Sequence, residues 1–408
     1  MAFCWIPVCC LMPPLVLSAY TLVSAVGCGL EATRSALREG RSGLRPCDFL
    51  DVRFPAWIGR VEAVEKVVLP RPLQHFDCRN NRLAYLGMCQ DGFAAAVGEA
   101  RRRYGADRIG VVVGTSTSGI LETELAFRGA DQTTGELPAP FSYQFAHNTF
   151  SVADFTGQFL GLGGPALAVS TACSSSSKAF ASGQRLIAAG LCDAVVVGGV
   201  DSLCLTTLLG FSALELVSDQ PCRPADVRRN GISIGEAAGY ALLERPAPGG
   251  TAGVALLGYG ESTDAYHMSS PHPEGLGARL AMEQALQRAG ITADQIDYVN
   301  LHGTATRSND TTEDKAVAGL FGDRVPTSSV KGWIGHTLGA AGIVNAIVSS
   351  LAIVDGTIPP SLNTREVDPE LRSWILTERL QRPVRHVLSN AFGFGGNNVS
   401  LVFGRVAA

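Results

Sequence analysis

A chain of 408 residues with 46% apolar and 17% charged residues can bury a large core, which excludes a disordered or fibrous protein. The formal net charge is only -4 and the sequence has no long basic run, so nucleic acid is not expected as the main partner. Eleven cysteines lie scattered through apolar stretches, without the paired spacing of a zinc site or a small secreted framework. We therefore expect free thiols in a reducing cytoplasm rather than a disulfide scaffold.

The first thirty residues contain no charged side chain, and in this respect they resemble an export signal. A signal peptide also needs a basic start, which is missing, and Pro7, Pro13 and Pro14 interrupt any membrane-spanning helix. From Val16 onward the sequence is typical of a buried strand entering a glycine turn. We predict an N-terminal extension over 1–15, no membrane span and a cytoplasmic protein.

Three short runs rich in β-branched residues follow, at 109–114, 166–170 and 194–199. Each is bounded by glycine or polar residues, as central strands of a sheet are. The stretch 174–193 between the last two runs is typical of a helix made of small residues. This alternation predicts an α/β architecture with largely parallel strands.

Two segments repeat each other, ADRIGVVVGTSTSG at 106–119 and ADQIDYVNLHGTATRS at 293–308. A fainter pair covers 169–199 and 328–356. Duplication of an α/β half explains both, and chance likeness of short strand–turn–helix units is the alternative. Pro and Gly cluster at 242–253, so we expect two halves, 16–247 and 253–408, to join there.

Cys173 lies between an expected strand and an expected helix, in VSTACSSSSKAF. The positive end of a helix dipole favours a thiolate, so this cysteine is either a nucleophile or a buried inert thiol. His302 and His336 each follow apolar residues and precede Gly or Thr. Each imidazole is either structural or able to donate an N–H or accept a proton. All three lie at expected strand or turn ends, where ligands commonly bind in such sheets.

The C-terminal sequence SNAFGFGGNNVSLVFG interleaves glycine with Phe392 and Phe394. Such glycines let backbone N–H groups point at a ligand oxygen, as in an oxyanion hole, although a plain turn also fits. No Gly-Lys-Ser/Thr follows that would indicate a phosphate loop. No metal-ligand spacing occurs, so no catalytic metal is expected.

VSTACSSS, NLHGTAT, SSVKGWIGHTLGAAG and NAFGFGGNN resemble, in order, four motifs of the β-ketoacyl-[acyl carrier protein] synthases of type I/II. The likeness runs from about Leu17 to the C-terminus. It implies the thiolase fold, in which two similar halves form one five-layered α-β-α-β-α unit. That expectation agrees with the internal repeat.

The resemblance implies that Cys173 receives an acyl chain and that His302 and His336 stabilise the enolate formed when malonyl loses carbon dioxide. Lys331 matches the lysine that organises the site, and the N–H groups of Cys173 and Phe394 match the oxyanion hole, with Phe394 also acting as a gate. The hydroxyls that bind the phosphopantetheine arm are matched by Thr304 and Thr306. The implied partners are an acyl carrier protein and a second subunit, either identical or a related condensing-enzyme-like chain. No permanently bound cofactor is implied, because the carrier's phosphopantetheine bears the substrates.

Some positions depart from the family pattern. Asn345 stands where the family commonly has Glu, and the usual Pro-x-Gly-Asp after the Thr pair is 307–310, Arg-Ser-Asn-Asp. The segments GTSTSGI, RNGISIGEAAG and DAYHMSSPHPEG resemble synthases of aryl-polyene pigment clusters. We also expect 115–124 to line the acyl pocket, and Arg79 and Arg82 to be either a carrier-docking site or solvated surface.

Three alternatives stay open beside the elongating synthase. A catalytically silent scaffold or chain-length subunit would keep the fold but never acylate Cys173. A coenzyme A thiolase is disfavoured by the two-histidine pattern. A cysteine hydrolase would need water at the nucleophile, which an apolar acyl tunnel would exclude.

Overall fold

The computed structural model describes residues 11–138, 141–246 and 253–406, and most of its strands belong to one 12-stranded sheet. Two small sheets lie beside it. The strands of the main sheet are β1 Leu15–Ser24, β2 Gly27–Cys28, β5 Ile109–Gly114, β6 Ala166–Val169, β7 Ala194–Asp201, β9 Ala237–Glu244, β10 Gly253–Thr263, β11 Tyr298–Asn300, β12 Pro326–Ser328, β14 Trp374–Ile375, β16 His386–Gly393 and β17 Asn397–Val406. The small sheets contain β3 Leu44–Pro46, β4 Trp57–Gly59 and β8 Ile234–Gly235, and β13 Thr357–Ile358 and β15 Leu380–Gln381.

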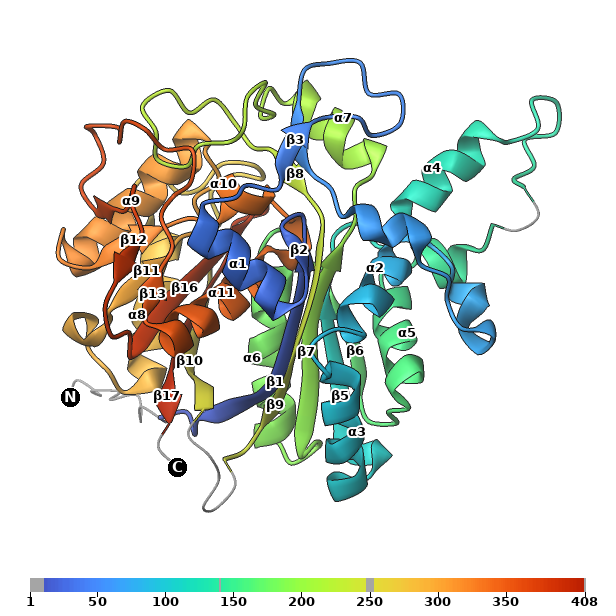
Figure 1. Ribbon diagram of the computed structural model, residues 1–408, viewed down its shortest axis with the longest axis horizontal. Helices are drawn as coiled ribbons and strands as arrows, with labels where there is room; N and C mark the ends of the chain where they lie inside the picture. Colours follow the sequence, from blue (N-terminus) through green and yellow to red (C-terminus); the bar gives the residue numbers. More distant parts are fainter. Residues whose placement is uncertain (1–10, 139–140, 247–252, 407–408) are drawn as a thin grey trace, which may run out of the picture.

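The main sheet consists of two strand groups that meet at its middle. One group has the order β14-β12-β11-β16-β17-β10 and the other β1-β9-β7-β5-β6, with β2 paired to β1. Only two residue pairs, Leu15 with Leu256 and Val16 with Ala255, join β1 to β10. The two groups therefore behave as the sheets of two halves that share a narrow seam (Figure 1).

Helices cover both sheets and fill the space between them. The α-helices are α1 Leu30–Glu39, α2 Arg79–Met88, α3 Phe93–Tyr104, α4 Ile120–Arg128, α5 Ser151–Leu160, α6 Ser175–Ala188, α7 Leu205–Ala213, α8 Leu276–Ala289, α9 Arg307–Phe321, α10 Lys331–Ile334 and α11 Ala341–Asp355. Short helical turns are η1 Glu62–Lys66, η2 Arg71–Phe76, η3 Ala106–Arg108, η4 Tyr143–His147, η5 Ala293–Gln295 and η6 Leu338–Ala340.

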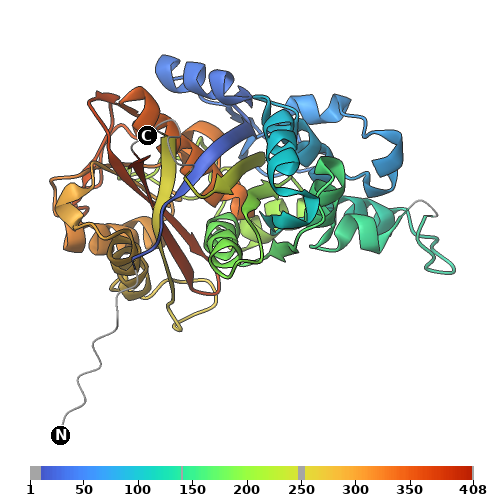
Figure 2. The ribbon, with the colours of Figure 1, turned by 90° about the horizontal axis from the view of Figure 1, so that it is seen from below.

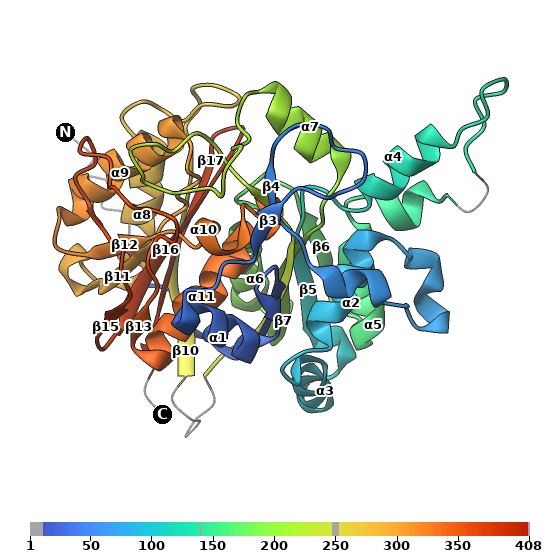
Figure 3. The same cartoon turned by 45° about the horizontal axis from the view of Figure 1, so that its top comes forward.

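Five layers result, and α6 and α11 form the middle one. Both helices pack against each other and against strands of the sheets on either side. The helices α2, α3 and α5 cover the outer face of the strand group that contains β1, β9, β7, β5 and β6. The helices α8 and α9 cover the outer face of the group that contains β10, β17, β16 and β11 (Figures 1 and 2). The thiolase-type architecture expected from the sequence is confirmed. Helix α4 projects away from these layers at the edge of the first half (Figure 3).

Small residues allow the middle helices to lie close to their neighbours. A Cβ on Gly342 of α11 would stand 2.3 Å from the Ser177 hydroxyl of α6, and one on Gly114 of β5 would stand 2.4 Å from the Ser176 nitrogen. Neither position has room for a larger residue. The run of Ser, Ala and Gly in these helices thus explains how α6, the helix after Cys173, reaches the centre of the molecule.

The expected strands at 109–114, 166–170 and 194–199 and the helix after Cys173 are confirmed as β5, β6, β7 and α6. The expectation of largely parallel strands is wrong for the middle of the sheet. There β9 runs antiparallel to β7 and β1, and β17 runs antiparallel to β10 and β16. The reason is connectivity, because β16 and β17 are joined by a tight glycine turn that only an antiparallel pair permits.

The predicted extension over 1–15 lies mostly outside the described residues. Of the predicted junction at 242–253, residues 247–252 lie outside them, and the described part includes the end of β9 and the start of β10. Within the described part, Met12 is buried and its N–H donates to the Arg288 carbonyl at 2.9 Å. One stretch, Leu338–Asp355, is long and apolar enough to cross a membrane, but 89% of it is buried inside the protein. The eight cysteines in the described residues are free thiols.

Candidate active site

Cys173 sits in a tight elbow between β6 and α6. The preceding residue, Ala172, has a left-handed backbone with φ of 50°, and α6 begins two residues later at Ser175. Left-handed backbone is costly for alanine, so the surrounding bonds must hold the turn. Ser174 and Ser175 do so, because their hydroxyls donate to the carbonyls of Thr171 and Ala172 at 2.8 and 2.5 Å.

The environment of the Cys173 thiol is more apolar than the sequence indicated. Burial raises the pKa of Cys173 to about 11, and the positive charge of Lys331 offsets only part of that effect. The backbone N–H groups of Cys173 and Phe394 also lower this pKa, but less than burial raises it. Desolvation of a buried thiol outweighs the favourable end of α6.

His336 contacts the thiol directly. Its Nε2 lies 3.0 Å from the Cys173 Sγ, and its Nδ1 accepts the N–H of Leu338 at 3.2 Å. An imidazole nitrogen that accepts a backbone N–H carries no proton, so the proton is on Nε2. Burial and the nearby Lys331 charge hold the pKa of His336 well below 6.5. His336 is thus a neutral N–H donor aimed at the nucleophile.

His302 reaches the same place from the end of β11. The two imidazole rings lie 5.3 Å apart, edge to face, and His302 is 2% exposed. The Lys331 ammonium lies 3.4 Å from His302 Nδ1 and also donates to the His302 carbonyl. Because an ammonium can only donate, Nδ1 accepts and Nε2 carries the proton. Burial first, then Lys331 and His336, hold the pKa of His302 well below 6.5.

Glu313 of α9, which the sequence reasoning missed, fixes the backbone of His302. Its carboxylate accepts the N–H groups of His302 and Gly303 at 2.8 and 2.7 Å and the Asn390 amide at 3.1 Å. It also provides the negative charge that counters burial of Lys331, whose pKa is lowered mainly by desolvation. The available signal was an acid on a helix eleven residues after His302, which is too weak to single out one carboxylate.

Asn345, the departure from the family pattern, lies behind the same histidine. Its side-chain amide donates to the carbonyls of Leu301 and Asn390 at 3.2 and 3.1 Å. The residue is buried in α11. A neutral amide therefore holds the residue that precedes His302, in a place where a carboxylate would have no hydrogen to donate.

The glycine-rich turn between β16 and β17 brings backbone N–H groups to the thiol. Gly393 approaches so closely that a Cβ there would lie 2.6 Å from the Thr171 carbonyl. The Phe394 N–H interacts with the Cys173 sulfur and, together with the N–H of Cys173, favours its negative form. The Phe394 ring packs against Phe211, with ring centroids 5.7 Å apart. This geometry can hold an oxyanion formed at Cys173.

A cavity of about 290 Å³ runs from the surface to these residues. Cys173, His302, His336 and Phe394 line its inner end. Thr304 and Thr306 also line it, and their hydroxyls lie 2.9 Å from each other. The structure thus brings together all seven residues singled out from the sequence, because Lys331 contacts His302 behind the cavity wall.

The thiol and the two imidazoles also form a donor set that zinc accepts, with ligand atoms within 4.8 Å of one another. Both Nε2 atoms carry protons, however, and Nδ1 of each ring is occupied by a donor. A metal would require both tautomers to change. The arrangement suits hydrogen-bond donation better than metal ligation.

Arg79 does not form the suggested docking site. Its side chain is only 6% exposed and pairs with Glu236 and Glu65 at 2.7 and 2.6 Å. Arg82 is half-buried and pairs with Asp77. The sequence reasoning allowed a solvated surface here, whereas α2 turns Arg79 toward the fully buried carboxylate of Glu236 and the more exposed one of Glu65.

Family models for the beta-ketoacyl synthase N-terminal and C-terminal domains match residues 88–248 and 254–365. The 3-oxoacyl-[acyl-carrier-protein] synthase 2 of Vibrio harveyi is 33% identical over 421 residues, which cover 96% of this chain and 98% of the relative. The chain belongs to the β-ketoacyl synthase family. This membership makes it an acyltransferase-class condensing enzyme, as the motifs indicated.

Other relatives agree with this family assignment. Nodulation protein E of Rhizobium meliloti (strain 1021) is 33% identical over 403 residues, covering 93% of this synthase and 97% of the relative. One chain of the solved complex of a ketosynthase (ApeO) with its chain length factor (ApeC) from Xenorhabdus doucetiae is 37% identical with a TM-score of 0.87, over 97% of this chain and 98% of that one. A beta-ketoacyl synthase from Burkholderia phymatum STM815 is 29% identical with a TM-score of 0.85, over 97% and 100%.

Proposed function

We propose that this protein elongates acyl chains held on an acyl carrier protein, by acyl transfer to Cys173 and a decarboxylative condensation with a malonyl thioester. The observation that carries the proposal is the convergence of two neutral Nε2–H donors, from His302 and His336, beside the Cys173 thiol. Two such donors suit an enolate oxygen, which carries the charge formed in decarboxylation.

In the first half-reaction the Cys173 sulfur attacks the carbonyl carbon of an acyl thioester. A carbon–sulfur bond to Cys173 forms, and the bond to the carrier's thiol breaks. The thiol proton of Cys173 ends on the departing carrier thiol, so the exchange needs no net base. The N–H groups of Cys173 and Phe394 stabilise the intermediate oxyanion.

In the second half-reaction a malonyl thioester occupies the cavity with its carbonyl oxygen between the two Nε2–H groups. Its terminal carbon–carbon bond breaks, carbon dioxide leaves, and the electron pair moves into an enolate. The enolate carbon attacks the acyl-Cys173 carbonyl, and the carbon–sulfur bond breaks to give the β-ketoacyl product. The released Cys173 thiolate takes up one proton, and its raised pKa favours that step.

The neutrality of both histidines suits this role. A cationic imidazolium would stabilise the malonyl carboxylate before it leaves, and so would oppose decarboxylation. Burial, and after it the Lys331 charge, keep both rings neutral. The ammonium of Lys331 does not face the cavity itself, because it points at the backbone and Nδ1 of His302.

The substrates in this proposal are carried on phosphopantetheine, and no permanently bound cofactor takes part. Thr304 and Thr306 offer hydroxyls to the amide groups of that arm along the cavity wall. The second subunit is either another copy of this chain or a related chain length factor. The ketosynthase from Xenorhabdus doucetiae, solved with such a factor, supports the latter. A cytoplasmic location would provide the carrier and the reducing conditions that free thiols require.

The decisive experiment is mass spectrometry of the Cys173 peptide after incubation with an acyl carrier thioester. An acyl adduct that malonyl carrier discharges to a β-ketoacyl product supports the proposal. A Cys173 that never acylates would instead indicate a silent scaffold subunit, and an adduct lost to water would indicate a hydrolase. Extension of polyenoyl or aryl primers in preference to saturated chains would support the aryl-polyene pathway, and refusal of such primers would reject it.

A further inference from the structure

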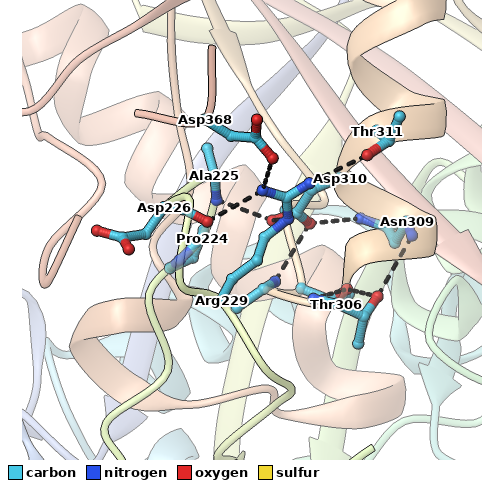
Figure 4. A network of polar contacts seen from close by, with 12 residues as sticks. Pro224, Ala225, Asp226, Arg229, Thr306, Asn309, Asp310, Thr311 and Asp368 are labelled. Atoms are coloured by element: carbon cyan, nitrogen blue, oxygen red, sulfur yellow. Dashed lines mark hydrogen bonds and ion pairs between the residues drawn. The ribbon is translucent and has the colours of Figure 1, made fainter. Parts of the chain in front are cut away.

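A fully buried arginine outside the catalytic group ties together the two halves of the protein. Arg229 lies in the loop between α7 and β8, and its side chain is 1% exposed. Its guanidinium donates to Asp368 at 2.6 Å, to Thr311 of α9 at 3.0 Å and to the Asp226 carbonyl at 3.0 Å. Its Nε lies 3.7 Å from Asp310 (Figure 4).

Asp310 connects this arginine to two strained turns. Its carboxylate accepts the N–H of Ala225 at 2.8 Å and the N–H of Ala305 at 3.2 Å. Both alanines have left-handed backbone, with φ of 64° and 67°. Alanine adopts that conformation only where surrounding bonds hold it, so Asp310 is a main support for both turns.

Ala305 is the residue between Thr304 and Thr306, which both line the cavity. Its N–H is held by Asp310, and its carbonyl accepts the N–H of Gly231, two residues after Arg229, at 3.0 Å. The carbonyl of the central residue is therefore bound directly to the loop that carries Arg229, and its N–H is bound to Asp310 of α9, whose other carboxylate oxygen accepts the N–H of Ala225 from that loop. The conformation of the threonine turn depends on where that loop lies.

The arginine's charge is as necessary as its shape. Asp310 and Asp368 are both buried, and two carboxylates in one buried cluster require a cation between them. Lysine could supply the charge but not the planar fork that reaches Thr311 and Asp368 together. A change that preserves the charge would thus keep the fold while loosening the position of Asp310.

We propose that Arg229 is a positioning residue that sets, through Asp310 and Gly231, the placement of the Thr304 and Thr306 hydroxyls, and so the affinity for the pantetheine arm. This inference rests on the proposed function, in which the arm occupies the cavity. Arg229 itself does not touch the cavity residues that perform chemistry, so it should affect substrate binding rather than the reactivity of the thiol.

The test compares Arg229→Lys with the wild-type enzyme, using an acyl-pantetheine thioester as substrate. We expect the KM to rise about tenfold, because that factor corresponds to the loss of roughly one hydrogen bond to the arm. The kcat should change less than about twofold. Alkylation of Cys173 by iodoacetamide, which has no arm, should keep its wild-type rate. The matched control is Arg79→Lys, which changes another buried arginine held by two carboxylates and should leave the KM unchanged.

A mutant cycle separates this role from general loosening. In a Thr304→Val/Thr306→Val background, Arg229→Lys should raise the KM no further, because it acts through those hydroxyls. Thr311→Val removes one hydrogen-bond acceptor of the Arg229 guanidinium without removing a charge, and should raise the KM about threefold. This variant replaces Arg229→Lys in the test if Arg229→Lys does not fold.

Three results would overturn the inference alone, namely an unchanged KM in Arg229→Lys, an equal rise in Arg79→Lys, or a full further rise in the double-valine background. A wild-type enzyme that fails to acylate Cys173 at all would instead reject the proposed function, and this role of Arg229 with it.

Discussion

Replacement of His302 by alanine tests the proposed division of labour most directly. His302 shares no hydrogen bond with the Cys173 thiol, whereas the His336 Nε2 lies 3.0 Å from it. Loading of Cys173 should therefore survive in His302→Ala. Decarboxylation should not, because one of the two N–H donors for the enolate oxygen is lost.

The expected loss in decarboxylation rate follows from the buried, fixed position of the His302 donor. His302 is 2% exposed, and its N–H is one of two donors held in fixed positions, which water entering the variant would not reproduce. Removing one donor from a preorganised oxyanion-type site costs about two to three decades in rate, or about 2.7–4 kcal/mol. The backbone around residue 302 should stay in place, because Glu313 and Asn345 bind it independently of the ring.

Two assays on the same preparation measure the two steps. Intact-protein mass spectrometry follows acylation of Cys173, and release of labelled carbon dioxide from malonyl carrier follows decarboxylation. His75→Ala is the control, since that histidine is exposed and outside the cavity. Wild-type carbon dioxide release by His302→Ala would refute the assignment of its Nε2–H to the enolate, and loss of loading would show that the ring serves the thiol instead.

The remaining predictions concern the nucleophile and the residue behind His302. Cys173→Ala should abolish acyl loading while leaving the fold intact, and normal elongation by this variant would end the proposal. Because burial raises the pKa of Cys173 to about 11, its alkylation by iodoacetamide should accelerate about tenfold per pH unit from pH 7 to 10, as the thiolate fraction rises. Peptide-resolved mass spectrometry would detect this slope, and a plateau near pH 8 would contradict it. Asn345→Asp should lower the free energy of unfolding by about 3 kcal/mol, because a buried carboxylate would face the Leu301 and Asn390 carbonyls without a donor. Urea denaturation measures this change, and an unaltered midpoint would disprove the role assigned to the amide.

Much of the site could be predicted because the chemistry is local in sequence. Cys173, His302, His336, Lys331 and Phe394 each lie in a short motif with small residues around it, and each motif folds into one strand end or turn. The small residues also predicted close packing, which the contact of α6 with α11 confirms. The parallel pairing of β5 with β6 and β7 followed from their β-branched runs in the same way.

The properties that make these residues reactive depend on long-range contacts. The Nε2–H tautomers are set by the Leu338 N–H and the Lys331 ammonium, and the raised pKa of Cys173 comes from burial. The sequence left Arg79 open as a surface residue, because no local pattern predicts its ion pair with Glu236, which lies 157 residues away. Glu313 was missed for the same reason. Its hydrogen-bond donors include backbone N–H groups, which almost every residue has, so no sequence pattern marks them.

The sequence by itself determined which side chains meet at the candidate site, because a cysteine, two histidines and a glycine turn stand in short motifs at particular bends of the chain. Only the tertiary structure decided their protonation, and the support that Arg229 and Asp310 give to the threonine turn. Tautomer, desolvation and charge pairing depend on distances between atoms that lie far apart along the chain, and folding alone sets those distances.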